Sequence, residues 1–449
     1  MAGMVVKNNM SAINTLNTLN KNHGALAKSL QKVSSGMKIN SAADDASGYA
    51  ISERMRVQIR SLDQDNKNTQ NGSALMKVAE GAVQSTVDIL KTLKEKVINA
   101  ANDTNTDSDR SQIQKELNQS IDQINDNANV TYNGKYLVDG THNAKGSVTN
   151  THMTNQSLAT NTIATSKLTE LANRVGDKLH INVDDNVTVS FVNEGTTYTT
   201  TMKITANSTL ASVLDAATSY AQSAAGGSAA ATVGVKIASD GYGSMIGTDK
   251  FGKALTTADK SNAVTVQALG TGVGNQIAGL TISITDKSGN INKSANAALD
   301  AFNETIRAEQ ESEDNSIVLQ TGTKANQAIK IGLTDMRAQA LGLQGAKGET
   351  LNIETQKNAN AAINVLDNAI QKALDQQTTI GAIESRLEYT STNLTTASEN
   401  VQASESTIRD ADMAKEMTEY TKNNVLLQAA QSMLAQANQN SSSVLSLLQ

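Results

Sequence analysis

The sequence predicts a mixed, predominantly α protein with long helical arms at both ends and a β-rich insert between them. Apolar residues recur at heptad spacing in both end regions, as they do in coiled-coil-like helical bundles. The middle of the chain changes to Thr, Ser, Gly and Asn, with alternating apolar stretches typical of strands. Proline is absent from all 449 residues and aromatics make up only 2%. Without proline, helices can run long without interruption, and with so few aromatic side chains we expect narrow cores of aliphatic residues.

The N-terminal arm opens with a narrow apolar seam, which predicts a helix that pairs with another helix. The seam consists of Ile13, Leu16, Leu19, Leu26, Leu30 and Val33. Gly36 is a stop signal for this helix. Ser41, Asp44 or Asp45 then offers an N-cap for a second helix, whose apolar face reaches Leu62. Further helical runs are predicted over 75–100 and about 106–128, before the turn-rich stretch YNGKYLVDG.

The insert, 141–314, is predicted to contain short strands and one short helix. In NVTVSFVNEGTTYTTTMKIT, alternating apolar residues flank a turn at 193–195, which predicts a hairpin. STLASVLDAATSYA predicts the helix, and ATVGVKIA and GLTISIT predict further strands. A second hairpin, in SIVLQTGTKANQAIKIGL, opens the C-terminal arm.

The C-terminal arm carries heptad runs from Ile363 onward, and no side chain after Lys422 is charged. The last apolar seam consists of Leu427, Ala430, Leu434, Ala437, Val444 and Leu448. Residues 1–40 contain five lysines and no acid, whereas 405–449 carry three bases and five acids. Opposite charge favours pairing of the two end helices, but exposed ion pairs are each worth under about 1 kcal/mol. The apolar seams are therefore the predicted self-assembly interface.

Composition and motifs exclude several classes of function. The net charge of −6 argues against a general nucleic-acid binder, and without cysteine no thiolate chemistry is possible. His23, His142, His152 and His180 form no H-E-x-x-H motif, and GTGVGN and GYGSMIG match no nucleotide-binding fingerprint. We interpret Asp44 and Asp45 as helix caps, and the methionines in helical runs as packing residues. No catalytic, cofactor-binding or metal-binding residue is predicted, and no apolar run is long enough for a membrane span.

The two end regions resemble the signatures of bacterial flagellin. The resemblance rests on VSSGMKINSAADDASGYAISERMRVQIRSLDQDNKNTQNGSALMKVAEGA, on ESTIRDADMAKEMTEYTKNNVLLQAAQSMLAQANQNSSSVLSLLQ and on IKIGLTDMRAQALGL. It implies a homopolymeric, extracellular filament subunit, exported by the flagellar type III system, with an export chaperone, hook-associated proteins and a cap protein as partners. The implied domains are an inner-tube helix 1–43, a helical rod half 44–140, the outer insert 141–314, a hairpin and second rod half 315–404, and a second inner-tube helix 405–449.

One helical stretch, DILKTLKEKVINAANDTNTDSDRSQIQKEL, resembles the flagellin segment that engages Toll-like receptor 5 on host cells. The family pattern is close to LQRVRELA with a downstream glutamate, and this chain keeps Leu90, Glu95 and Glu116. Lys91, Thr92, Lys94 and Lys96 stand where Gln, Arg, Arg and Leu are usual. Since Thr92 lacks the five-donor guanidinium and Lys96 replaces an apolar contact, we expect weakened receptor binding.

Two alternatives stay open at this point. A hook–filament junction protein shares the terminal-helix design, although VLSLLQ and the AQANQ run fit filament flagellin better. A flagellin whose insert has a binding or adhesive role is the second alternative.

Overall fold

The computed structural model describes residues 9–226, 231–238, 245–257 and 262–447. They fall into two compact units. Unit 1 comprises residues 1–70, 320–327 and 389–449, and unit 2 comprises 71–319 and 328–388. The predicted fold class is confirmed, because long helices from both ends of the chain pair and a β-rich region lies between them in sequence.

The described helices are α1 (Met10–Ser35), α2 (Ala46–Ala100), α3 (Asp107–Ala128), α4 (Leu210–Ala225), α5 (Lys293–Leu299), α6 (Gln356–Arg409) and α7 (Met413–Leu447). Gly36 ends α1 as predicted, in a left-handed conformation with a φ of 71°, and its N–H donates to Lys32 O at 2.9 Å. Asp45 is the cap of α2, since its Oδ1 accepts from the backbone N–H groups of Ser47 and Gly48, each at 3.0 Å. These ends follow from local sequence alone.

Helix α2 joins two stretches that the sequence predicts as separate helical runs. Gly72 lies inside it, and a Cβ on this residue would come within 2.3 Å of Leu319 Cδ1. Glycine weakens a helix interior by about 0.5–1 kcal/mol relative to alanine. Here it allows the strand that carries Leu319 to approach the helix backbone, so packing explains its presence.

The strands are β1 (Thr131–Tyr132), β2 (Lys135–Tyr136), β3 (His152–Asn155), β4 (Asn186–Asn193), β5 (Thr196–Lys203), β6 (Val235–Ile237), β7 (Met245–Thr248), β8 (Ala254–Thr256), β9 (Val264–Ala268), β10 (Ile277–Thr285), β11 (Phe302–Ile306), β12 (Ile317–Gln320) and β13 (Ala328–Ile331). Among the described residues they form sheets ordered β10-β4-β5 and β11-β3-β9-β6 and the hairpins β1-β2, β7-β8 and β12-β13. The predicted hairpins at 187–203 and 317–332 and the strands within 231–238 and 279–285 are confirmed.

Unit 2 contains two hydrophobic cores. Core 1 is formed by α2, α3, α6 and the segments around β12 and β13, with Leu90, Ile121 and Leu366 fully buried. Core 2 belongs to the insert, where the two larger sheets, α4 and α5 enclose residues such as Phe191 and Leu214. Each core is built mostly from aliphatic side chains, as the low aromatic content predicts.

Backbones approach closely where the insert meets the rest of unit 2. A Cβ on Gly279 of β10 would lie 2.8 Å from Val365 Cγ2 and 2.9 Å from Val365 N. At the β4–β5 turn, a Cβ on Gly195 would lie 2.4 Å from Glu349 O. Such distances leave no room for a side chain, so the insert is packed directly onto α6 and the loop that precedes it.

Helix α6 also covers the edge of the insert sheet. Strand β10 is an edge strand, and edge strands carry backbone groups without ladder partners. Asn364 Nδ2 donates to Leu280 O at 3.1 Å, and Asn368 Nδ2 donates to Ala278 O at 2.8 Å. Because positions four apart share one helix face, these two amides meet the carbonyl oxygens of alternate strand residues.

Candidate assembly surface

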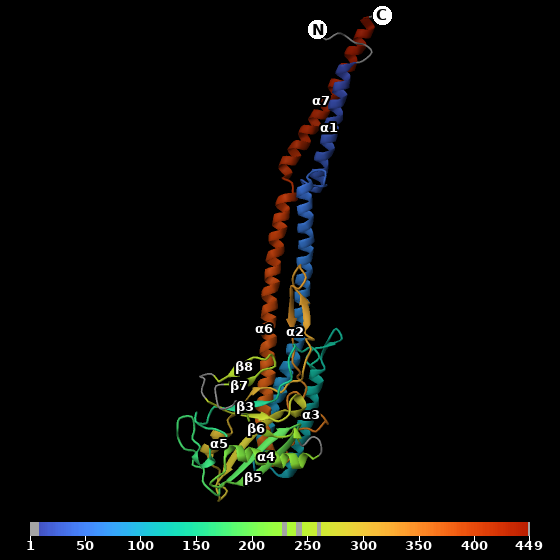
Figure 1. The fold of residues 1–449 in the computed structure, drawn as a ribbon. Helices are drawn as coiled ribbons and strands as arrows, with labels where there is room; N and C mark the ends of the chain where they lie inside the picture. The colour runs from blue at the N-terminus through green and yellow to red at the C-terminus, as the bar shows by residue number, and fades with distance from the viewer. Residues whose placement is uncertain (1–8, 227–230, 239–244, 258–261, 448–449) are drawn as a thin grey trace. The chain divides into compact units, whose positions relative to one another are not determined.

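The end helices α1 and α7 run side by side in unit 1 (Figure 1). Asn9 Nδ2 donates to Ala437 O and Asn22 Nδ2 donates to Leu426 O, each at 3.2 Å. As the residue number rises on α1 it falls on α7, so the pairing is antiparallel. The prediction that the two end helices pair is therefore confirmed, and the pairing occurs within a single chain.

The pairing leaves much of the predicted seam uncovered. Ile13 is 45% exposed, Leu16 45% and Leu30 52%. Five further seam residues are half-buried: Leu19, Leu26, Val33, Leu427 and Leu434. Only Ala430 and Ala437 are buried. Leu448 and the side chain of Val444 lie outside the described residues.

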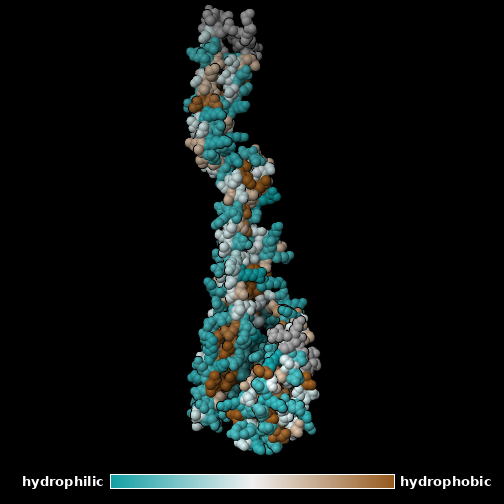
Figure 2. Space-filling model, turned by 90° about the vertical axis from the view of Figure 1, so that its left-hand side faces the viewer, coloured by the Kyte–Doolittle hydropathy of each residue, from teal (hydrophilic) through white to brown (hydrophobic). Residues whose placement is uncertain are grey.

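Further apolar residues of α1 and α7 are exposed outside the predicted seam. They are Met10, Met413, Met417, Val425, Leu426 and Met433, of which Met10 and Met433 are each 61% exposed. Within the single chain the four methionines of this set are not buried, whereas Met76 is fully buried as a packing residue. Figure 2 shows apolar side chains at the surface of this helical pair. We call the exposed and half-buried apolar residues of α1 and α7 the assembly surface.

Charge is distributed asymmetrically over the same helices. Lys32 Nζ lies 3.5 Å from Glu416 Oε1, which links the basic α1 to the first turn of α7. A single ion pair near the surface contributes little to stability. No side chain of α7 after Lys422 is charged, so apolar contact is the main attraction available to that part of the helix.

A polar junction holds the segments where α1 and α6 end. Lys38 N–H donates to Arg409 O at 2.7 Å, and Ala411 N–H donates to Gly36 O at 2.9 Å. The buried Arg409 guanidinium lies 2.6 Å from Glu53 Oε1, and its hydrogen bond is the main cause of a lowered pKa at Glu53. These contacts hold together the segment that joins α1 to α2 and the segment that joins α6 to α7, both in unit 1.

The stretch that resembles a receptor-binding segment lies on α2 and α3 within unit 2. Leu90 is fully buried in core 1, so its side chain is not available to another molecule in this structure. Lys91, Thr92 and Glu95 are exposed. Lys96 Nζ pairs with Glu116 Oε1 at 3.1 Å, and Lys94 pairs with a carboxylate of α6, Asp367. The segment presents charged side chains around a buried leucine.

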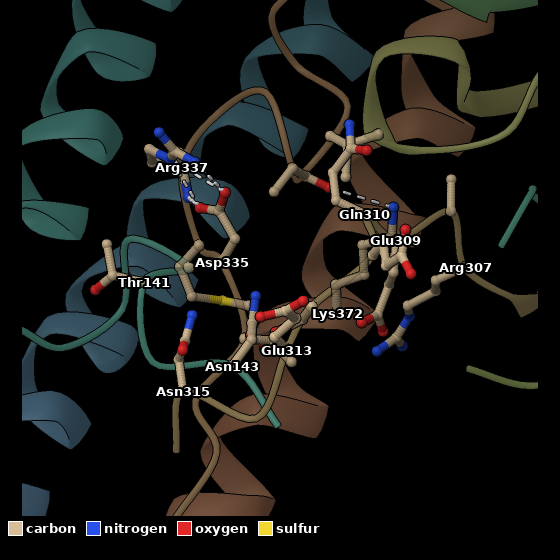
Figure 3. Close-up of a pocket in the computed structure, with 18 residues that line it drawn as sticks. Thr141, Asn143, Arg307, Glu309, Gln310, Glu313, Asn315, Asp335, Arg337 and Lys372 are labelled. Carbon is tan, nitrogen blue, oxygen red and sulfur yellow. Dashed lines mark hydrogen bonds and ion pairs between the residues drawn. The ribbon is translucent and has the colours of Figure 1, made fainter. Parts of the chain in front are cut away.

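Unit 2 also holds a cavity of about 420 Å³ beside α6 (Figure 3). Arg337 and Asp335 face one another across hydrogen bonds at one wall, with Nη2 and Oδ2 2.6 Å apart. At another wall, Lys372 Nζ donates to Gln276 Oε1 at 3.1 Å and pairs with Glu304 Oε1 at 3.3 Å. Burial raises the pKa of Glu304, an effect that the Lys372 ammonium opposes. Arg337 is thus paired with Asp335, and Lys372 with Glu304.

Within the described part of the chain, no helix has the length and apolar character that crossing a membrane requires. Nor do these described residues bring three His, Asp or Glu side chains together in a group that could hold a metal ion.

The fold and the assembly surface define a class of structural subunit, in which both chain ends form paired helices that leave apolar side chains exposed. Family models for the bacterial flagellin N-terminal and C-terminal helical regions match residues 6–143 and 363–448. A flagellin of Clostridium tyrobutyricum is 33% identical, over 97% of this chain and 99% of that protein. A flagellin of Bacillus subtilis is 29% identical, over 99% of this chain and 100% of that protein. The chain belongs to the bacterial flagellin family.

Among the solved structures that the chain matches is that of flagellar hook associated protein-3 from Legionella pneumophila. It is 13% identical, covers 78% of this chain and 97% of that one, and has a TM-score of 0.32.

Proposed function

We propose that this chain is a structural subunit that polymerises with copies of itself into the bacterial flagellar filament. The observation that carries the proposal is the assembly surface, because a folded chain that leaves Ile13, Leu16 and Leu30 about half exposed has apolar area for a partner to cover. Burying apolar surface contributes about 25 cal/mol per Å², which is the main attraction in such an interface.

Polymerisation of purified monomer tests the proposal. Monomer would be seeded with short filament fragments and followed by sedimentation and electron microscopy, alongside a truncation that lacks residues 423–449 and an Ile13→Asn/Leu30→Asn variant. We expect long filaments from the natural chain and soluble protein from both variants. The matched control is Val175→Asn, at a residue of the insert that is 87% exposed, and it should polymerise normally.

Other outcomes would change the assignment. Circular dichroism must first show that each variant keeps the helix content of the natural chain. If folded Ile13→Asn/Leu30→Asn protein polymerises as the natural chain does, the assembly surface is not the contact. Short, capped assemblies from the natural chain would favour a hook–filament junction protein.

The same assignment includes a route and a location. We infer that the flagellar type III system exports the chain with the help of an export chaperone, that hook-associated and cap proteins flank the polymer, and that the filament is extracellular. Family membership supports this inference. If the chain still reaches the medium from cells without the flagellar export gate, the inferred route is wrong.

The roles of the segments are proposed on the same basis. Residues 1–43 and 405–449 would form the inner tube, 44–140 and 315–404 the surrounding rod, and 141–314 the outer surface. Paired α1 and α7 support the first role, and α2, α6 and core 1 support the second. A filament map in which 141–314 faces the central channel would contradict the proposal.

We also propose weakened recognition by Toll-like receptor 5. Lys94 and Lys96 are held in ion pairs with Asp367 and Glu116, so a receptor would have to break these pairs in addition to losing the usual arginine and leucine. Restoring Thr92→Arg and Lys96→Leu should raise potency in receptor reporter cells, with the exposed Lys115→Leu as the control. An unchanged dose response would remove the basis for the proposal.

A further inference from the structure

The chain contains the dipeptide Asn-Gly twice, in two different backbone settings. Asn133-Gly134 is the turn of the β1–β2 hairpin, whereas Asn71-Gly72 lies inside helix α2. Asparagine followed by glycine is the sequence in which a backbone amide can most easily reach a side-chain amide, because glycine has no Cβ to obstruct the approach. The two sites therefore share one chemistry and differ in conformation.

The hairpin site is open. Asn133 has a φ of 50° and Gly134 a φ of 76°, and their neighbours Tyr132 and Lys135 pair directly. Two positive φ values in a two-residue loop define a type I′ turn. Both turn residues are exposed, and no atom lies within 4 Å of the position of a Cβ on Gly134. Among the described residues, none accepts a hydrogen bond from the Gly134 amide.

The helical site is closed. Gly72 is buried, and the Leu319 side chain covers its Cα. Within a helix the amide N–H of each interior residue is donated to the carbonyl oxygen four residues earlier, and the dihedral angles on both sides are fixed. The Gly72 nitrogen is therefore held away from the Asn71 side chain.

We propose that Asn133 is a site of spontaneous covalent modification, in which its side-chain amide is converted to a carboxylate while Asn71 stays intact. The Gly134 nitrogen attacks Asn133 Cγ, the new C–N bond closes a five-membered imide, and Nδ2 leaves as ammonia with the proton that the Gly134 nitrogen loses. Water then adds to one of the two imide carbonyl carbons. Ring opening gives aspartate, or isoaspartate when the chain continues through the side-chain carboxyl.

The modification changes a specific part of unit 2. It adds one negative charge beside Lys135, and isoaspartate adds a backbone methylene that the Tyr132–Lys135 pairing cannot accommodate. Tyr132 packs against core 1, and Leu137, whose N–H donates to Val130 O at 3.3 Å, is fully buried. We therefore expect loss of protection at the Leu137 amide in the isoaspartate form.

Peptide mapping of aged protein tests the proposal. Native protein would be incubated at mildly alkaline pH, and ammonia loss and isoaspartate would be measured at both sites by mass spectrometry and electron-transfer fragmentation. We expect conversion at Asn133 to be several-fold faster than at Asn71. A parallel sample in denaturant should react at both sites, because the unfolded chain removes the difference in conformation.

A matched variant separates the chemistry from the stability of the hairpin. Asn133→Gly keeps the positive φ and removes the side-chain amide, so it should fold normally and show no age-dependent change in this peptide. Equal rates at the two sites in native protein would overturn the proposal. Conversion in denaturant together with none at Asn133 in the folded chain would do so as well.

Discussion

The carboxyl group of Asp300 shows how one residue can link the insert to the solution pH. It follows α5, and its Oδ1 accepts from Asn364 Nδ2 of α6 at 3.1 Å. Burial raises its pKa from 3.8 to about 6, while the hydrogen bonds from Asn364 and from the Ile282 backbone act in the opposite direction. Compared with the unfolded chain, the folded protein therefore favours the protonated carboxyl group of Asp300.

The sign of the pH dependence follows from this shift. A group with a raised pKa in the folded state contributes its stabilisation fully below the unfolded pKa of 3.8 and loses it as the pH rises through about 6. We predict that from about pH 4 to pH 7 the natural chain loses on the order of 2 kcal/mol of unfolding free energy more than Asp300→Asn does. Urea denaturation followed by circular dichroism measures the difference.

An exposed acid elsewhere on the insert is the control for this experiment. Asp215→Asn on α4 should track the natural chain at every pH, because Asp215 is exposed. If Asp300→Asn and Asp215→Asn give the same pH profile, burial of Asp300 does not couple folding to pH.

At the scale of single elements, α6 has two roles on two faces. One face supplies apolar side chains such as Ala369 and Ala373 to core 1, and another supplies donors to the edge strand β10. A helix that covers a sheet edge blocks unwanted strand pairing as well as satisfying backbone groups. The insert sheet therefore depends on α6 for its hydrogen bonding.

Removing one donor of α6 tests this dependence. Asn368→Ala leaves Ala278 O without its 2.8 Å partner, and a buried acceptor without a partner costs about 1–3 kcal/mol. We predict a loss of that size in unfolding free energy and faster hydrogen exchange in β10. Asn360→Ala, at an exposed position of the same helix, should have neither effect. Unchanged exchange in β10 after Asn368→Ala would show that the strand edge is held by other contacts.

The elements could be predicted from the sequence where local signals are strong. Heptad spacing indicates the long helices, and the predicted turn at 193–195 indicates the β4–β5 hairpin. Strands β3, β9 and β11 were not predicted, because their pairing joins residues that are far apart in the sequence and their burial depends on that pairing.

Only part of the assembly surface could be predicted from the sequence. Periodicity identified the seam of α1 and α7, but it could not tell which seam residues the partner helix covers. Ala430 is buried while Leu30 is half exposed, and this difference depends on how the two helices pair. For Leu90 the sequence suggested exposure that the structure does not show. The resemblance places this residue in a receptor-binding segment, but its side chain lies in core 1.

At the scale of the whole molecule, the two units differ in how much apolar surface they bury. Core 1 and core 2 both lie in unit 2, whereas α1 and α7 contribute only Ser29, Ala430 and Ala437 to the buried residues described. Local stability follows buried contacts, so regions with few of them open most easily.

This difference predicts the pattern of hydrogen exchange in the monomer. Amides of α1 and α7 should exchange much faster than amides of α6 between 356 and 388, because the latter are packed in core 1. Exchange followed by mass spectrometry measures both regions in one experiment. Equal protection of α7 and of this part of α6 would contradict the argument.

The composition of the two cores also sets the order in which the chain can fold during synthesis. Core 2 is made of residues between 153 and 302, so a ribosome-bound chain that has emerged past this range already holds all its members. Core 1 joins residues 75–138 to residues as late as Leu387, and α1 must wait for α7. Late in its synthesis, each nascent chain therefore passes through a stage in which all core 2 residues are present while the helical segments of core 1 and unit 1 still lack their partners.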